Sequence, residues 1–274
     1  MKRVNILATL AITSLFATSI LAGCGSSGSA GNDQGKPQLS NSGSAAASKP
    51  HLIMATSADY PPYEFHDLKN NNKISGFDID IANAIAKQLN FDFEIKDMDF
   101  NGLIPALQAK RADFVMAGMT PKPERLKNAD FSIIYYEAKN TIVARKDSNI
   151  TKPEDLAGKK VGVQLGSIQE GDAKDLAKKE KGMQVVPLNK VPDIIQELKS
   201  NRIDAAIIED TVAKGYTDAN KDLMFTTIPT TGPSGSAVAF PKGSKWVDKF
   251  NSVLKKMKAD GEIDALVKKW FEKK

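Results

Sequence analysis

Beyond the first fifty residues, apolar positions recur with the periods of strands and helices. The segments 52–55, 91–95 and 114–118 have the short apolar or alternating patterns of strands, and the last is apolar enough to be buried on both faces. Residues 77–89 carry an apolar side chain at every fourth position, which predicts one buried face of a helix. A second short helix is predicted at 103–107, with a proline tolerated in its first turn.

The same order of elements returns in the second half of the chain. Strands are predicted at 161–163, 183–188 and 205–208, and helices at 169–181 and around 194–198. Helices of a β-α-β-α-β unit pack against a mainly parallel sheet, so two such units predict two α/β lobes. A single larger sheet is the alternative that the pattern leaves open.

The last part of the chain has two stripes of apolar residues, each at the spacing of one helix face. Apolar residues recur at helical spacing over 246–257 and again over 263–270, and Gly261 separates them. Stripes of this kind are structural far more often than functional. We therefore expect both helices to pack as core onto a sheet.

The N-terminal segment follows a different pattern. Residues 1–23 begin with Lys2 and Arg3, carry no charge after them, and end in a Leu-Ala-Gly triplet before Cys24. This is the pattern of a secretory signal peptide, and bacterial lipoproteins use a cysteine directly after the cleavage site. We expect Cys24 to be lipidated and to hold the protein at the outer face of the cell membrane, with palmitate among its acyl chains. A plain signal peptide is the alternative, and a spanning helix is disfavoured because small residues end the run.

The segment 24–50 is rich in Ser, Gly, Ala and Asn and has almost no large apolar residue. Such a stretch cannot bury enough surface to offset the entropy lost on ordering, so it predicts a flexible tether.

Composition places the remainder among ordinary globular proteins. Of the 274 residues, 41% are hydrophobic and 26% are charged, which supplies a core and excludes disorder of the whole chain. The net charge of +5 comes largely from scattered lysines, without the clustering that nucleic-acid binding needs. One cysteine and two histidines are too few for a His/Cys zinc site, so we expect neither a metal nor a cofactor.

Candidate chemistry lies where the predicted strands end, since ligands of open α/β sheets collect beyond the carboxyl ends of strands. Gly118 lets a ligand approach the backbone closely, and Thr120 adds an amide and a hydroxyl. The planar guanidinium of Arg125 matches a carboxylate, although a surface ion pair is the alternative. A Gly166-Ser167 turn before a helix is a natural place for a negative group.

Further residues at these ends suit a positive group. Glu209 and Asp210 end a predicted strand and could accept an ammonium, or could only cap the next helix. Tyr60 and Phe100 could sandwich a flat cation, at about 0.5–2 kcal/mol per ring. Each signal is weak by itself, but together they describe a clamp for a zwitterion.

Four motifs at these positions belong together: Tyr60-Pro61-Pro62-Tyr63-Glu64-Phe65, Gly76-Phe77-Asp78-Ile79-Asp80, Gly118-Met119-Thr120 with Arg125, and Val161-Gly162-Val163-Gln164-Leu165-Gly166-Ser167. With the cysteine motif, they resemble the polar amino-acid-binding proteins of ABC importers, solute-binding protein family 3, over nearly all of 52–274. The stretches 117–125, 161–170 and 205–216 look most like the arginine-binding lipoproteins of Gram-positive bacteria.

The resemblance implies a clamshell whose lobes are 51–138 with 236–274, and 139–235. Two hinge strands would join them, one crossing near 137–141 and one returning near 235–239. The ligand would bind between the lobes, which would close around it.

The resemblance also assigns roles. An arginine matching Arg125 grips the ligand α-carboxylate, a carboxylate matching Glu209 holds the α-ammonium, and aromatics matching Tyr60 and Phe100 flank the side chain. Asp210, next to Glu209, keeps the assignment of the ammonium site open by one position. The whole implied ligand-binding set is Ser57, Tyr60, Phe100, Ala117, Gly118, Met119, Thr120, Arg125, Gln164, Ser167, Ile168, Gln169, Glu209 and Asp210.

The tip of the ligand side chain is expected to meet Ser57 and Gln169. Many family members have aspartate where Ser57 stands, so a cationic tip must find its negative charge elsewhere. Asp59, Glu64 and Asp99 are the candidates.

The expected function is that of an extracytoplasmic binding lipoprotein, acting as a monomer, that captures L-arginine for an ABC permease and its ATPase subunits. Lysine and histidine are further candidate ligands, and glutamine or cystine would make it a receptor for another polar amino acid. An enzyme such as a dehydratase on the same fold is the rival class. It is disfavoured because no histidine stands near the strand ends to act as acid or base.

Overall fold

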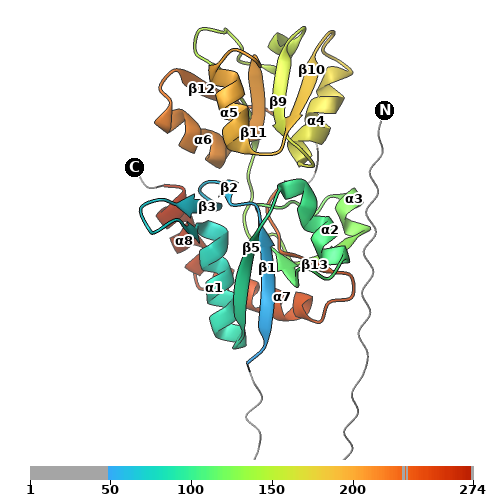
Figure 1. The fold of residues 1–274 in the computed structure, drawn as a ribbon, viewed down its shortest axis with the longest axis vertical. Helices are drawn as coiled ribbons and strands as arrows, with labels where there is room; N and C mark the ends of the chain where they lie inside the picture. The colour runs from blue at the N-terminus through green and yellow to red at the C-terminus, as the bar shows by residue number, and fades with distance from the viewer. Residues whose placement is uncertain (1–48, 230–231, 233, 273–274) are drawn as a thin grey trace, which may run out of the picture. The chain divides into compact units, whose positions relative to one another are not determined.

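The computed structural model describes residues 49–229, 232 and 234–272 (Figure 1). The predicted signal peptide, Cys24 and nearly all of the predicted tether lie outside the described residues.

The first of two large sheets has the strand order β5-β1-β6-β13-β7. β1 runs parallel to β5 and β6, whereas β13 runs antiparallel to β6 and β7. Its strands are β1 (His51–Thr56), β5 (Asp92–Asp97), β6 (Phe114–Val115), β7 (Ala129–Phe131) and β13 (Ala239–Pro241).

Helices flank this sheet, and a small antiparallel sheet adjoins it; together they form lobe 1 (Figure 1). The helices are α1 (Phe77–Leu89), α2 (Leu103–Gln108), α3 (Pro123–Leu126), α7 (Trp246–Ala259) and α8 (Glu262–Trp270), with a 3-10 turn at Phe100–Gly102. The small sheet consists of β2 (Asp59–Tyr60), β3 (Glu64–Asp67) and β4 (Lys73–Ser75). The sequence pattern did not predict this small sheet, because its strands are too short to show a period.

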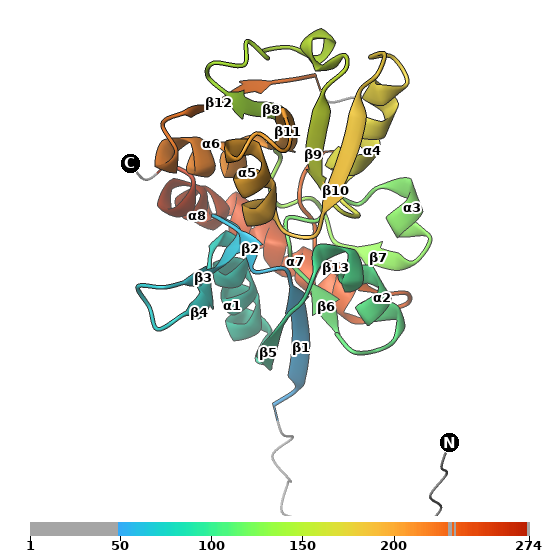
Figure 2. The same ribbon diagram turned by 45° about the horizontal axis from the view of Figure 1, so that its top comes forward.

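The second large sheet has the order β10-β9-β11-β8-β12 and forms lobe 2 with its helices (Figure 2). Its strands are β8 (Asn140–Arg145), β9 (Lys160–Gln164), β10 (Gln184–Leu188), β11 (Ala205–Glu209) and β12 (Leu223–Thr227). The helices are α4 (Ile168–Ala177), α5 (Val191–Lys199) and α6 (Asp210–Ala219), and Pro153–Leu156 forms a 3-10 turn.

The two-lobed α/β fold is confirmed, and the alternative of one larger sheet is wrong. Each sheet is mixed rather than mainly parallel. β9, β10 and β11 are parallel to one another, as the repeated units predict, but β8 pairs antiparallel with β11 and β12. The antiparallel pairings arise where the chain crosses between the lobes: β8 follows the first crossing and β13 follows the return.

The two crossings run side by side. Tyr136 and Ser236 form an antiparallel bridge, in which the Ser236 amide donates to the Tyr136 carbonyl at 2.7 Å. Gly235 lies beside them with φ of +105°, and a Cβ there would stand 2.8 Å from the Tyr136 carbonyl oxygen. Only glycine fits this position without moving the backbone.

The C-terminal helices pack onto lobe 1, as their stripes predicted. Phe250 of α7 is fully buried against the rings of Phe91 and Phe114. After α8, Phe271 lies 4.7 Å, between ring centroids, from both Phe77 and Tyr136. Phe271 thereby packs against the first crossing segment.

Candidate ligand-binding site

A pocket lies where the strand ends of the two lobes face each other, with an empty volume of about 430 Å³ that includes the open solvent at its mouth. Both lobes and both crossing segments contribute to its wall. The sequence-predicted residues that line it are Tyr60, Phe100, Ala117, Gly118, Thr120, Arg125, Gln164, Ser167, Ile168, Gln169 and Glu209.

Arg125 presents a positive charge to this pocket. Its side chain, on α3, is 6% exposed. Nη1 donates to the Thr120 carbonyl and Nη2 to the Gly166 carbonyl, both at 2.9 Å, and the guanidinium stands 5.1 Å from the Phe100 ring centroid. Burial lowers its pKa to about 10, so it stays charged at neutral pH. Among the described residues no carboxylate forms an ion pair with it.

The loop after β6 brings backbone groups to the pocket. Gly118 has φ of +55°, and a Cβ there would lie 3.3 Å from the Tyr60 ring. Its amide donates to Asp78 Oδ2 at 2.9 Å, which ties the loop to α1. The glycine thus allows the loop to approach Tyr60 closely while the carboxylate of Asp78 holds it in place.

The turn after β9 supplies the lobe 2 side. Ser167 caps α4, and its hydroxyl accepts from the Glu170 amide at 3.1 Å. The Glu170 carboxylate in turn accepts from the Gly166 amide at 2.7 Å, so this amide is occupied. The amides of Ile168 and Gln169 open the helix, where backbone donors lack an intrahelical partner. They are the donors that α4 can offer to an anion.

Glu209 presents a carboxyl group to the same pocket. It ends β11, is 5% exposed, and accepts hydrogen bonds from the hydroxyls of Tyr63 and Thr211. Burial raises its pKa to about 8. Asp210 begins α6 instead, where its Oδ1 accepts from the amides of Lys139 and Thr211. Of the two acids, Glu209 lines the pocket and Asp210 does not.

Ser57 and Met119 also lie outside this wall. The Ser57 hydroxyl donates to Asp59 Oδ1 at 3.1 Å, and both residues line a neighbouring cavity next to Asp99. The Met119 side chain is buried in a hydrophobic cluster with Leu103, and its carbonyl accepts from the Ala237 amide at 2.9 Å. The direction of each side chain depends on local loop geometry, which the sequence pattern does not specify.

Five pocket residues were not predicted: Ala138, Asn140, Ser234, Gly235 and Ser236. All come from the crossing segments, which reach the pocket only through tertiary structure. Asn140 is held by two side chains, accepting from Gln169 Nε2 at 2.9 Å and donating to Asp172 Oδ2 at 2.5 Å. Its only signal in the sequence was a polar residue at the first position of the buried strand β8.

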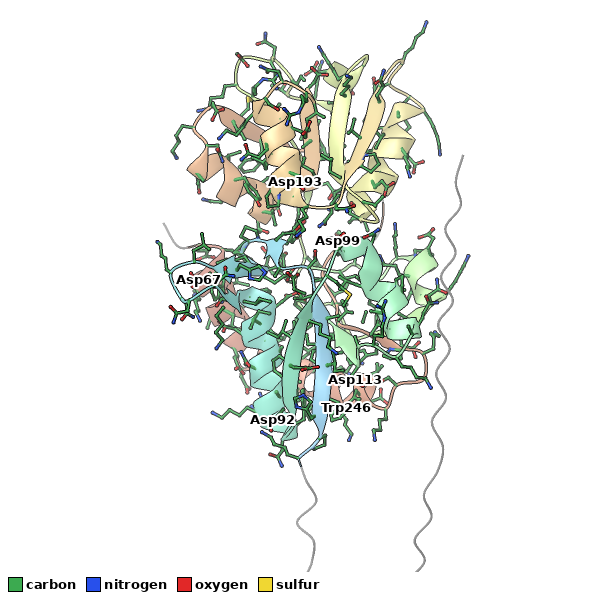
Figure 3. The ribbon with its side chains drawn as sticks, viewed as in Figure 1. Asp67, Asp92, Asp99, Asp113, Asp193 and Trp246 are labelled. Carbon is green, nitrogen blue, oxygen red and sulfur yellow. The ribbon has the colours of Figure 1, made fainter. Side chains whose placement is uncertain are left out.

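The neighbouring acids have different partners. Asp99 lies at the edge of lobe 1 that faces lobe 2 (Figure 3) and accepts from Asn189 Nδ2 at 3.0 Å. Asp59 Oδ1 accepts from the Ser57 hydroxyl, and the buried Oδ2 of Asp59 has no donor among the described residues. Burial raises the pKa of Asp59 to about 6. Glu64 is fully buried, and burial next to Asp78 raises its pKa well above its ordinary value.

The residues that line the pocket are therefore suited to binding a ligand. The buried guanidinium of Arg125 and the buried carboxyl group of Glu209 line one pocket, and among the described residues neither forms an ion pair. Gln164 adds a buried Nε2 that has no acceptor within the described part of the chain. The described residues contain no group of three or more acidic, histidine or cysteine side chains placed to hold a metal ion. Within them, too, no helix is long and apolar enough to cross a membrane.

A family model, that of the bacterial extracellular solute-binding proteins, family 3, matches residues 52–273. The chain belongs to this family. Its members are solute-binding proteins rather than enzymes, which agrees with a site that has binding groups and no histidine.

Relatives within solute-binding family 3 are close. The arginine-binding extracellular protein ArtP of Bacillus subtilis is 51% identical over 234 residues, which cover 85% of this chain and 90% of that protein. An ancestral arginine-binding protein solved with bound arginine is 42% identical, with a TM-score of 0.76 over 81% of this chain and 99% of that one. A periplasmic binding protein of Salmonella typhimurium with high arginine specificity is 32% identical, with a TM-score of 0.75 over 81% and 99% of the two chains.

Proposed function

We propose that this protein is an extracytoplasmic receptor that captures free L-arginine and delivers it to an ABC importer. The observation that carries the proposal is the pair of buried ionisable groups on the wall of one pocket, the guanidinium of Arg125 and the carboxyl group of Glu209, which form no ion pair with the described residues. An α-amino acid supplies a carboxylate for the first and an ammonium for the second. The arginine-binding relatives support arginine as that amino acid.

In the proposed pose, the ligand carboxylate bonds to the Arg125 guanidinium and to the amides that open α4. The ammonium bonds to Glu209, and the aliphatic part of the side chain lies between Tyr60 and Phe100. Each charge-assisted hydrogen bond contributes about 1.5–3 kcal/mol. Several of them must act together, because a micromolar dissociation constant requires about 8 kcal/mol of net binding free energy.

The guanidinium of the ligand needs negative charge at the far end of the pocket. Asp99 already accepts from Asn189 across the lobes. Asp59 has one buried oxygen without a donor from the described residues, and Glu64 has two. We assign the compensation of the guanidinium to Asp59, which lines the neighbouring cavity, because forming a hydrogen bond to a buried acceptor that lacks one is favourable. Glu64 lines neither the pocket nor that cavity. Lysine and histidine would place a cation in the same region.

The cellular setting follows from the N-terminus and the family. Lipidation of Cys24 would hold the protein at the membrane, where a permease and its ATPase subunits would receive the ligand. One acyl chain anchors only marginally, and a diacylated cysteine supplies the second chain that stable anchoring needs. The pocket is built from one chain, so a monomer suffices for binding.

Isothermal titration calorimetry with arginine, lysine, histidine, glutamine, cystine and glutamate tests this proposal. We expect arginine to bind most tightly, at least about tenfold ahead of glutamine, because each tenfold step requires only about 1.4 kcal/mol. Tighter binding of glutamine or cystine would make the protein a receptor for another polar amino acid. Tighter binding of glutamate would contradict the assigned charges.

A further inference from the structure

A tyrosine of lobe 1 forms a hydrogen bond with the acid that lobe 2 presents to the pocket. The hydroxyl of Tyr63, in the loop between β2 and β3, donates to Glu209 Oε1 at 2.6 Å. The side chain of Tyr63 is fully buried and does not line the pocket, whereas that of Glu209 does. The Tyr63 hydroxyl can therefore influence a ligand only through Glu209.

Packing fixes the position of the Tyr63 ring. The ring stacks on that of Tyr60, with 5.7 Å between the centroids, and lies 5.1 Å from the ring of Phe271. Phe77 and Tyr136 meet it edge-on, with centroids at 5.9 Å and 6.0 Å. A ring enclosed in this way loses little further freedom when its hydroxyl forms a hydrogen bond, so the donor is in place before a ligand arrives.

A second hydroxyl donor for the same oxygen comes from lobe 2. Thr211, in the first turn of α6, also donates to Glu209 Oε1. An ionised carboxyl group accepts hydrogen bonds at both of its oxygens. Because Oε1 is held by one donor from each lobe, Oε2 is the oxygen that can serve a ligand in the pocket.

The two donors respond differently to opening of the lobes. Thr211 moves with Glu209, because α6 directly follows β11 in lobe 2. Tyr63 belongs to lobe 1, so any separation of the lobes lengthens its bond to Glu209. In this structure the lobes are in contact, as the hydrogen bond from Asn189 to Asp99 also shows. Both donors therefore reach Glu209 only while the lobes are together.

We infer that Tyr63 is a positioning residue for recognition of the ligand α-ammonium. Its hydroxyl, with that of Thr211, holds the Glu209 carboxyl group so that Oε2 meets the ammonium, and the contribution of Tyr63 exists only while the lobes are together. The inference rests on the proposed function, because it needs a ligand with an α-ammonium. Closure of the lobes, rather than lobe 2 alone, then sets how strongly the site prefers an amino acid over the same molecule without its amino group.

Calorimetric titration with L-arginine and with δ-guanidinovalerate, which is arginine without its α-amino group, tests this inference. Tyr63→Phe keeps the packed ring, and Thr211 still donates to Oε1, so we expect the variant to fold. Its arginine affinity should fall about tenfold or more and its affinity for the analogue about threefold at most, because the orientation of Oε2 matters only to a ligand with an ammonium.

A second variant and a matched control accompany this substitution. Thr211→Val removes the other hydroxyl at nearly constant shape and should lower the ratio of the two affinities in the same direction. Tyr135→Phe removes a hydroxyl that is equally buried and also donates to a carboxylate, Asp78 Oδ1 at 2.8 Å, but both partners lie in lobe 1 and neither lines the pocket. This control should bind both ligands like the wild type. Melting temperatures without ligand show whether each variant is folded.

The outcomes separate this inference from the proposed function. An unchanged arginine affinity in Tyr63→Phe, or equal losses for the two ligands, would overturn the inference and leave the proposed function intact. If Tyr63→Phe does not fold, an unchanged ratio of affinities in Thr211→Val would overturn the inference instead. Absence of arginine binding by the wild type would overturn the proposed function, and the inference with it.

Discussion

Arg125 Nη2 donates to the carbonyl oxygen of Gly166 at 2.9 Å, which joins α3 of lobe 1 to the turn after β9 in lobe 2. Nη1 of the same guanidinium donates to the carbonyl oxygen of Thr120. The cation is therefore held in position by both lobes without a ligand carboxylate. Fixing a binding group in advance lowers the entropy that binding must overcome.

Replacing Arg125 by alanine should weaken arginine binding at least about a hundredfold. The change removes two or more charge-assisted hydrogen bonds to the ligand carboxylate, at about 1.5–3 kcal/mol each. Calorimetric titration measures the loss. Arg202→Ala, which removes an exposed arginine paired with Glu197, should bind like the wild type. A nearly unchanged affinity in Arg125→Ala would mean that this guanidinium only links the lobes.

Much of the fold could be predicted from periodicity. The helices at 77–89 and 246–257 and the parallel strands β9, β10 and β11 lie close to their predicted positions, because burial of one face imposes a regular spacing. β8 and β13 were not predicted to run antiparallel. Strand direction depends on where the chain crosses between the lobes, which periodicity within a segment does not encode.

Of the candidate site, too, only some residues could be predicted from the sequence. Residues at strand ends, such as Arg125 and Glu209, could be placed at the pocket because strand ends share one edge of a sheet. Asn140 and Ser236 could not, since they reach the pocket only through the paired crossings. Whether Ser57 contacts the ligand stays a prediction; its hydroxyl bonds to Asp59 in this structure.

Gly166 should be needed for the close approach of the two lobes. It has φ of +79°, and a Cβ there would lie 3.0 Å from the Cβ of Asn101 in lobe 1. Gly166→Ala should therefore lower arginine affinity about tenfold or more, because the crowded atoms hold the lobes apart. Titration calorimetry gives the affinity, and thermal unfolding gives the stability.

Gly243 offers a matched control for this substitution. Its φ is +74°, and a Cβ there would have no atom within 4 Å. Gly243→Ala should carry the backbone strain alone, about 1 kcal/mol, with a lower melting temperature and unchanged affinity. Equal losses of affinity in the two variants would show that contact with Asn101 is irrelevant.

Cys24 should decide where the protein is found. Cys24→Ala removes the thiol that lipidation requires, so the mature protein should be released from cells that carry it on the membrane. Fractionation with immunodetection measures the distribution between membrane and medium. Ser40→Ala, a change within the predicted tether, should leave the protein on the membrane. Membrane association that survives Cys24→Ala would exclude the lipid anchor.

The ligand-free protein should become less stable as the pH rises from about 5 to about 8. Burial raises the pKa of Glu209 from 4.5 to about 8, so the folded state binds this proton more tightly than the unfolded state. The stabilisation is fully present below pH 4.5 and is lost towards pH 8, by about 1.4 kcal/mol per pH unit for this group. Urea unfolding at several pH values measures the slope. Glu209→Gln should flatten this slope, whereas Glu262→Gln, a change on the exposed first turn of α8, should not. The same slope in Glu209→Gln as in the wild type would show that Glu209 is ionised in the folded protein.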